Sequence, residues 1–200
     1  MKRAAAPALV GLLLASAAPA RAQIIGEPAN PYPDPSKFAR GLYVEAEAGT
    51  ALFLGQADGI RPGPAMGLRF GYDIFRWAAV QLHGFGSSHA TDFPGLPQTA
   101  QMLQLLQGTA ELKLSVPWRQ WAISGVAGGG IGRFSTNLLG TTTLAPPEAR
   151  LTALYGGGLG VDYHTASRHF SFGLHSTFTK LTRVRTTGIV SSALYLRYTF

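Results

Sequence analysis

The sequence predicts an all-β fold, an eight-stranded antiparallel up-and-down transmembrane β-barrel. Three observations predict it. After residue 40, no stretch shows the periodicity of an amphipathic helix, whereas eight segments alternate between apolar and polar residues. The links between those segments are alternately short and long. The last segment ends on an aromatic residue, Phe200.

Composition narrows the chemistry that the chain can carry. It has 200 residues, of which 46% are hydrophobic and 14% are charged, and it has no cysteine. A chain this apolar is expected to fold. Without cysteine, thiol catalysis, disulfides, Fe–S clusters and cysteine-based zinc sites are excluded. The formal charge is +7, but Lys2, Arg3 and Arg21 lie in a segment expected to be cleaved, so no nucleic-acid partner is predicted.

The first 40 residues are predicted to lie outside the barrel. Residues 1–22 have the features of a cleaved signal peptide: Lys2 and Arg3, an apolar run too short to span a membrane, and a small-residue cleavage pattern. Residues 23–40 are polar and rich in proline, which blocks both helices and strand pairing. We predict a periplasmic linker there, serving as a spacer or as a docking peptide. Residues 41–200 then form the barrel.

The first four strands are predicted from period-two alternation. Segment by segment, the apolar positions are Leu42, Val44, Ala46 and Ala48; Met66, Leu68, Phe70, Tyr72 and Ile74; Ala78, Val80 and Leu82; and Ala110, Leu112, Leu114 and Val116. Most of the residues between them are polar, charged or glycine, which places two different faces on each strand.

The last four strands follow the same rule. Their apolar positions are Trp121, Ile123 and Ala127; Tyr155, Leu159, Val161 and Tyr163; Phe170, Phe172, Leu174 and Phe178; and Leu194, Leu196, Tyr198 and Phe200. Glycine takes many of the intervening positions in the fifth and sixth segments, where we expect it to ease the curvature of the barrel.

The lengths of the links favour a membrane barrel. Short links are predicted near residues 75–76, 117–119 and 165–168, and long ones at 55–64, 88–100, 135–150 and 180–188. Short turns on one side and long loops on the other are typical of outer-membrane barrels. Closing the sheet leaves no unpaired edge in the lipid. An even number of strands returns the chain to its starting side, which is predicted to be the periplasm.

A soluble, lipocalin-like barrel would show the same alternation with its apolar face inward. Two features favour the membrane. The more polar face is crowded with glycine and charge, whereas the other face carries large aliphatic and aromatic residues. Trp77, Trp118 and Trp121 lie near the short turns, where an interfacial aromatic belt is expected.

The final residues, YLRYTF, resemble the C-terminal strand signal of bacterial outer-membrane proteins, with Tyr198 and the terminal Phe200 as its aromatic residues. Residues 41–200 resemble the superfamily of small eight-stranded barrels that includes the OmpA transmembrane domain, OmpX and OmpW. The stretches VAGGGIGRF and YGGGLGVDY are similar to glycine-rich strands of that family. The resemblance implies an outer-membrane location, contact with outer-membrane lipid and lipopolysaccharide, and insertion by the barrel-assembly machinery. The peptidoglycan-binding domain of full-length OmpA is not expected.

The polar face is predicted to line the barrel interior. Its charged residues are Glu45, Glu47, Arg69, Asp73, Glu111, Lys113, Asp162 and Arg197, accompanied by Gln81, His83, His164, His169 and His175. An eight-stranded barrel is only wide enough for side chains to fill. We therefore expect these groups to pair, with Glu45 and Glu47 opposite Arg69 or Arg197. The alternative is a narrow polar passage.

No catalytic, cofactor-binding or metal-binding residue is predicted. The histidines show no metal-ligand spacing. The glycine runs at 128–130 and 156–158 lack the following helix that a phosphate-binding loop needs. Some small outer-membrane barrels modify lipid A, and the deacylase type has a His-x-Ser motif. His175-Ser176-Thr177 departs from that spacing and would place the first two side chains on opposite faces.

Two of the long loops carry further signals. Lys180, Arg183 and Arg185 indicate a basic loop, either an anion-binding loop for sugars or lipopolysaccharide phosphates or simply a solvated cationic loop. Residues 135–148 carry three leucines and are predicted to dock on another protein or to fold over the barrel mouth.

These features together predict a non-enzymatic outer-membrane barrel without cofactors, acting as a structural, anchoring or interaction component of the cell envelope. Its partners would be other envelope proteins. One version is a subunit of an envelope-spanning machine, such as a secretion or gliding-motility complex. The alternatives are an OmpW-like narrow passage for small solutes and a lipid A-modifying enzyme.

Overall fold

The computed structural model describes residues 41–55, 59–92, 102–135, 151–165, 169–182 and 186–200. The predicted signal peptide and linker lie in residues 1–40, outside the described residues. Within the described part of the chain, no helix has the length and apolarity that a helical membrane span requires.

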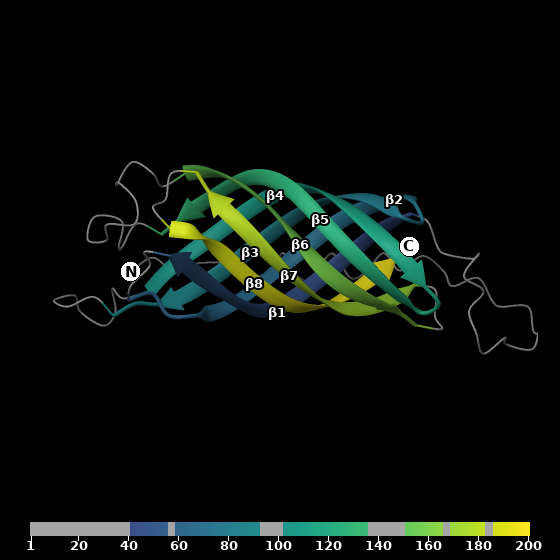
Figure 1. Cartoon of the computed structure of the whole chain (residues 1–200), viewed down its shortest axis with the longest axis horizontal. Coiled ribbons are helices and arrows are strands. Elements are labelled where there is room, and N and C mark those ends of the chain that lie inside the picture. Colours follow the sequence, from purple (N-terminus) through teal and green to yellow (C-terminus); the bar gives the residue numbers. More distant parts are fainter. Residues whose placement is uncertain (1–40, 56–58, 93–101, 136–150, 166–168, 183–185) are drawn as a thin grey trace, which may run out of the picture. The chain divides into compact units, whose positions relative to one another are not determined.

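Eight antiparallel strands form a closed barrel, in which each strand pairs with its sequence neighbours and β1 pairs with β8 (Figure 1). The strands are β1 (Leu42–Gly55), β2 (Gly63–Phe75), β3 (Ala78–Ala90), β4 (Met102–Trp118), β5 (Trp121–Phe134), β6 (Leu151–His164), β7 (Phe170–Leu181) and β8 (Thr186–Thr199). The predicted all-β up-and-down barrel is confirmed.

The two ends of the barrel differ in their links. Strand β2 leads into β3, β4 into β5 and β6 into β7 at one end of the barrel, which we call the turn end. Tyr43 and Thr199 are partners in the β1–β8 register, so the barrel both begins and finishes at the turn end. The other ends of the eight strands define the opposite end of the barrel, which we call the loop end.

Several strands extend farther toward the loop end than the alternation predicts. Strand β4 begins at Met102 and β8 at Thr186, each several residues before the predicted segment. Lys180 accordingly lies in β7 and not in a loop. The inward residues of the β4 extension, Leu103 and Leu105, are themselves apolar. This removes the contrast between apolar and polar positions that marks a strand in the sequence.

The outer face of the barrel is apolar. Phe70, Leu159 and Leu194 are 59%, 71% and 68% exposed, and each of the eight strands carries exposed large apolar residues. A closed barrel with such an outer band is suited to hydrocarbon. The soluble alternative, with its apolar face inward, is therefore wrong.

The interior of the barrel has two zones. The half nearer the turn end is polar and charged. The half nearer the loop end, which we call the apolar zone, is formed by Ala51, Phe53, Ile60, Ala65, Phe85, Leu103, Leu105, Phe134, Leu154, Leu181 and Ile189. The interior is therefore not polar throughout, as the alternation alone would suggest.

Inward glycines of β5 and β6 allow neighbouring strands to approach closely. A Cβ atom at Gly130 would overlap the carbonyl oxygen of Gly108 on β4, and one at Gly156 would overlap that of Phe178 on β7. The wall can bend sharply here because these side chains are missing, which supports the predicted role in curvature.

Candidate functional site in the barrel interior

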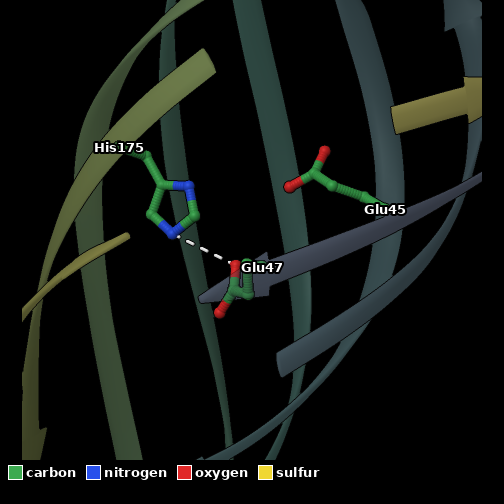
Figure 2. A group of neighbouring side chains, drawn as sticks. All are labelled: Glu45, Glu47 and His175. Atoms are coloured by element: carbon green, nitrogen blue, oxygen red, sulfur yellow. Dashed lines mark ion pairs between the residues drawn. The ribbon is translucent and has the colours of Figure 1, made fainter. Parts of the chain in front are cut away.

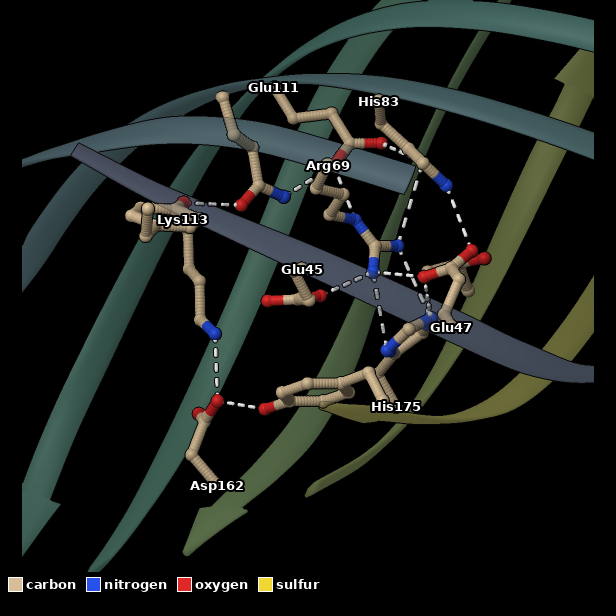
Figure 3. Close-up of polar contacts among 12 residues, drawn as sticks. Glu45, Glu47, Arg69, His83, Glu111, Lys113, Asp162 and His175 are labelled. Carbon is tan, nitrogen blue, oxygen red and sulfur yellow. Dashed lines mark hydrogen bonds and ion pairs between the residues drawn. The ribbon is translucent and has the colours of Figure 1, made fainter. Parts of the chain in front are cut away.

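Arg69 on β2 is the centre of a buried ionic cluster (Figure 3). The antiparallel register places it beside Glu45 on β1. Its Nη1 atom donates to Glu45 Oε1 at 2.7 Å and also to Glu47 Oε2, and its Nε atom lies 3.5 Å from Glu111 Oε2. Arg69 is only 2% exposed, so its charge is balanced by these carboxylates rather than by solvent.

His83 on β3 lies between two of the same carboxylates. Its Nε2 atom is 2.9 Å from Glu47 Oε1, and its Nδ1 atom is 3.0 Å from Glu111 Oε1. This arrangement suits an imidazolium, which donates from both ring nitrogens, because ionised carboxylates only accept hydrogen bonds. His175 on β7 adds a contact of 3.2 Å between its Nε2 atom and Glu47 Oε2. We call these residues, with Arg69 and Glu45, the Arg69 cluster.

Two further ion pairs lie in the polar half. Lys113 on β4 donates to Asp162 Oδ1 on β6 at 2.7 Å, and the hydroxyl of Tyr195 donates to the same oxygen. Arg197 on β8 pairs with Asp73 on β2. The eight charged residues predicted for the interior thus form three groups: the Arg69 cluster, the Lys113–Asp162 pair and the Arg197–Asp73 pair.

Glu45, Glu47 and His175 resemble a metal site, because their ligand atoms lie within 4.8 Å of one another (Figure 2). Arg69 already occupies the position between them. Its Nη1 atom bonds both carboxylates and lies 3.5 Å from His175 Nδ1. The guanidinium supplies the positive charge that the carboxylates need, and a metal ion would have to displace it. These three residues therefore do not fit a metal ion while Arg69 is in place.

No protein-family model matches this sequence, and no curated protein matches it. Solved structures do match. Neisserial surface protein A aligns with a TM-score of 0.59 and 17% sequence identity, over 81% of this chain and 99% of its own. The outer membrane protein OprG from Pseudomonas aeruginosa aligns with a TM-score of 0.50 and 16% identity, over 81% of this chain and 97% of its own. This chain has the fold of the small eight-stranded outer-membrane barrels.

This outer-membrane barrel fold leaves small internal spaces. A cavity of about 30 Å³ adjoins the Arg69 cluster and is lined by Gln107, Thr109 and Ser191 among others. A second cavity, of about 10 Å³, adjoins Lys113 and Tyr195. A water molecule needs a cavity of about 10–15 Å³. The two cavities therefore fit water and not a larger solute.

The aromatic residues at the end of the barrel chain lie on its outer face. The Tyr198 ring contacts the edges of Phe170 and Phe200, with centroid separations of 5.0 and 5.1 Å. The backbone nitrogen of Phe200 donates to the Leu42 carbonyl at 3.0 Å. The predicted assembly signal thus lies where β8 closes against β1.

The predicted basic loop is only partly described. Lys180 lies on β7, where Tyr155 of β6 is its partner in register, so it is not a loop residue. Arg183 and Arg185 lie outside the described residues, as does the predicted docking segment after Ser135.

Two tyrosines in the interior carry polar roles that the sequence did not indicate. The Tyr43 hydroxyl donates to Gln81 Oε1 at 2.7 Å, and the guanidinium carbon of Arg197 lies 3.6 Å from the centroid of the Tyr43 ring. Tyr195 bonds Asp162. Alternation places both tyrosines inward, and that position combined with the hydroxyl is the signal that could have identified them.

His169 is not in the interior, contrary to the prediction. Its side chain is exposed, its ring stacks on Tyr198, and its Nδ1 atom lies 2.7 Å from the Thr199 carbonyl oxygen. Residue 169 belongs to the link between β6 and β7, and period-two alternation does not hold outside a strand.

Proposed function

We propose that this chain is a non-enzymatic barrel of the outer membrane that anchors or docks other components of the cell envelope. The filled interior carries this proposal, because the Arg69 cluster and the apolar zone occupy the lumen with paired and packed side chains. Such a barrel has its outer wall, loops and ends available for interaction. The outer-membrane barrels among the structural neighbours support this location.

In the proposed arrangement, the turn end faces the periplasm and the loop end faces outward. The proline-rich residues 23–40 precede β1 in the sequence, and β1 begins at the turn end. We assign them the role of a docking segment. In the finer form of the proposal, the chain is a subunit of an envelope-spanning machine for secretion or gliding motility.

Cross-linked purification of the tagged chain from its own outer membrane tests the anchoring role. We expect reproducible recovery of envelope proteins, and loss of that recovery when residues 23–40 are replaced by a Gly/Ser segment of equal length. An unrelated small barrel with the same tag is the control. If the control recovers the same proteins, or if this chain recovers none, the anchoring role is wrong.

A narrow passage for small solutes is the second candidate, favoured by the water-sized cavity next to His83. A passage would require the Arg69 cluster and the apolar zone to open. We expect liposomes loaded densely with the protein to stay sealed to small solutes. A steady flux that rises in the variant Phe85→Ala, which trims the cavity wall, would favour the passage over the anchor.

The lipid A-modifying activity is not proposed because the required side chains diverge. His175 faces inward, whereas Ser176 faces outward and lies 3.0 Å from Ser192 Oγ. A nucleophile and its base must be within hydrogen-bond reach. Lipid A from cells that overexpress the chain should therefore be unchanged. A modified lipid A that disappears in the His175→Ala variant would overturn this conclusion.

A further inference from the structure

Two neighbouring hairpin turns at the turn end each carry an arginine that is next to a tryptophan in the sequence. In the sequence, Arg76 stands between Phe75 and Trp77, whose rings stack on each other with centroids 5.2 Å apart, and Arg76 itself is half-buried. In the turn that links β4 to β5, Arg119 follows Trp118, which is 71% exposed. Tryptophan rings on the outer face of a membrane protein lie at headgroup level. The two turns, with Arg76 and Arg119, are therefore expected at about that level.

The backbone of Arg119 is in an unfavourable conformation. Its φ angle is 56°, in the left-handed region that turns normally fill with glycine or asparagine. A long side chain at this position does not stabilise the turn, because the positive φ angle favours glycine or asparagine. The presence of arginine is therefore better explained by what its side chain contacts outside the barrel.

The two turns lie side by side. Strand β3 pairs with β4, and the Ser115 nitrogen on β4 donates to the Trp77 carbonyl at 2.8 Å. This bond ties the turn that carries Arg76 to the strand that leads into the turn of Arg119. The two cations thus occupy one sector of the rim.

Neither arginine has an anionic partner among the described residues. The acids nearest the turn end, Asp73 and Asp162, point into the barrel and are paired with Arg197 and Lys113. The rim near Arg76 and Arg119 therefore carries positive charge that the described part of the protein does not balance.

We infer that Arg76 and Arg119 form a binding site for the phosphate groups of anionic phospholipids in the leaflet at the turn end. Guanidinium groups bind phosphate oxygens through paired hydrogen bonds. Basic groups at a membrane surface also favour anionic lipids over zwitterionic ones. The inference rests on the barrel lying in a bilayer and not on the proposed anchoring role.

The test measures which lipids the full chain retains. The protein is placed in nanodiscs of equal parts phosphatidylcholine and phosphatidylglycerol, and native mass spectrometry counts the lipids that remain bound on release. We expect phosphatidylglycerol to be enriched on the wild type. Each of Arg76→Gln and Arg119→Gln should lower that enrichment about fivefold, since one basic residue near the surface contributes about 1 kcal/mol.

The matched control is Arg61→Gln, which removes an exposed arginine near the loop end whose charge is already balanced by Asp92. It should leave the enrichment unchanged.

Arg119→Gly relieves the strained backbone, so it should lose phosphatidylglycerol while the barrel stays at least as stable to heat. Full retention in the double variant, an equal loss in the control, or displacement of the lipid by inorganic phosphate alone would overturn the inference. None of these outcomes bears on the recovery of envelope proteins that tests the anchor.

Discussion

Arg69 and Glu47 form an ion pair in the barrel interior, and Glu47 is also contacted by His83 and His175. One carboxylate therefore joins three cationic or hydrogen-bonding groups from β2, β3 and β7. Arg69 is the main positive charge that balances the carboxylates of Glu45, Glu47 and Glu111, which lie on β1 and β4. Its removal leaves the carboxylates buried without their main positive charge.

The variant Arg69→Met should destabilise the barrel by about 3–5 kcal/mol, the cost of breaking a buried ion pair from one side. Urea titration of the barrel in lipid vesicles measures this change. Arg61→Met is the control, because Arg61 pairs with Asp92 where both side chains are more than half exposed. It should cost at most about 1 kcal/mol. Equal losses in the two variants would contradict the central role of Arg69.

The variant His83→Gln should lower stability by about 1–3 kcal/mol, because an amide cannot donate to Glu47 and Glu111 at once from the ring positions. The same urea titration measures it. His169→Gln is the matched control, since His169 is exposed and outside the interior. A His83 variant as stable as this control would show that the two carboxylates do not need the imidazolium.

The variant Leu112→Arg should cost about 2–4 kcal/mol, because Leu112 lies on the lipid-facing side of β4 away from both ends. Val116→Arg, close to the turn end and Trp118, should cost only about 0–1 kcal/mol. Refolding into vesicles compares the two. If the two costs are equal, the outer wall is not buried in hydrocarbon as its exposure pattern indicates.

The variant Gly130→Ala should prevent closure of the barrel, because its Cβ would overlap the backbone of Gly108. Gly125→Ala is the control: it adds the same methyl group on β5, where the nearest atom is 3.9 Å away. Heat-dependent mobility on gels separates folded from unfolded barrels. Normal folding of the Gly130 variant would mean that the wall is less sharply bent.

Deletion of Phe200 should lower the yield of assembled barrel in cells while refolding into vesicles remains efficient. This difference is expected because the residue would be read by the assembly machinery, whereas its packing on Tyr198 is a small part of the wall. Phe172→Ala removes another exposed ring near the turn end and serves as the control. Equal yields in cells from the deletion variant and the wild type would contradict the prediction that Phe200 is part of an assembly signal.

Local alternation is enough to predict the strands near the turn end, the apolar outer face, and the inward positions of Glu45, Arg69 and Asp162. Successive side chains of a strand point to opposite faces whatever that strand pairs with, so these features can be derived from local alternation. The same logic failed for His169 and for the start of β4. In the first case there is no strand, and in the second case leucine and methionine occur on both faces, beside the outward Gln104.

Which inward charges form ion pairs depends on how the strands are arranged around the closed barrel. Arg197 pairs with Asp73 because barrel closure brings β8 and β2 to either side of β1. Lys113 reaches Asp162 from β4 to β6 in the same way. These contacts depend on strand register and on the stagger of the closed barrel, which no local pattern of residues encodes. The sequence predicted Arg69 or Arg197 as the partner of Glu45 and Glu47, and the β1–β2 register selects Arg69.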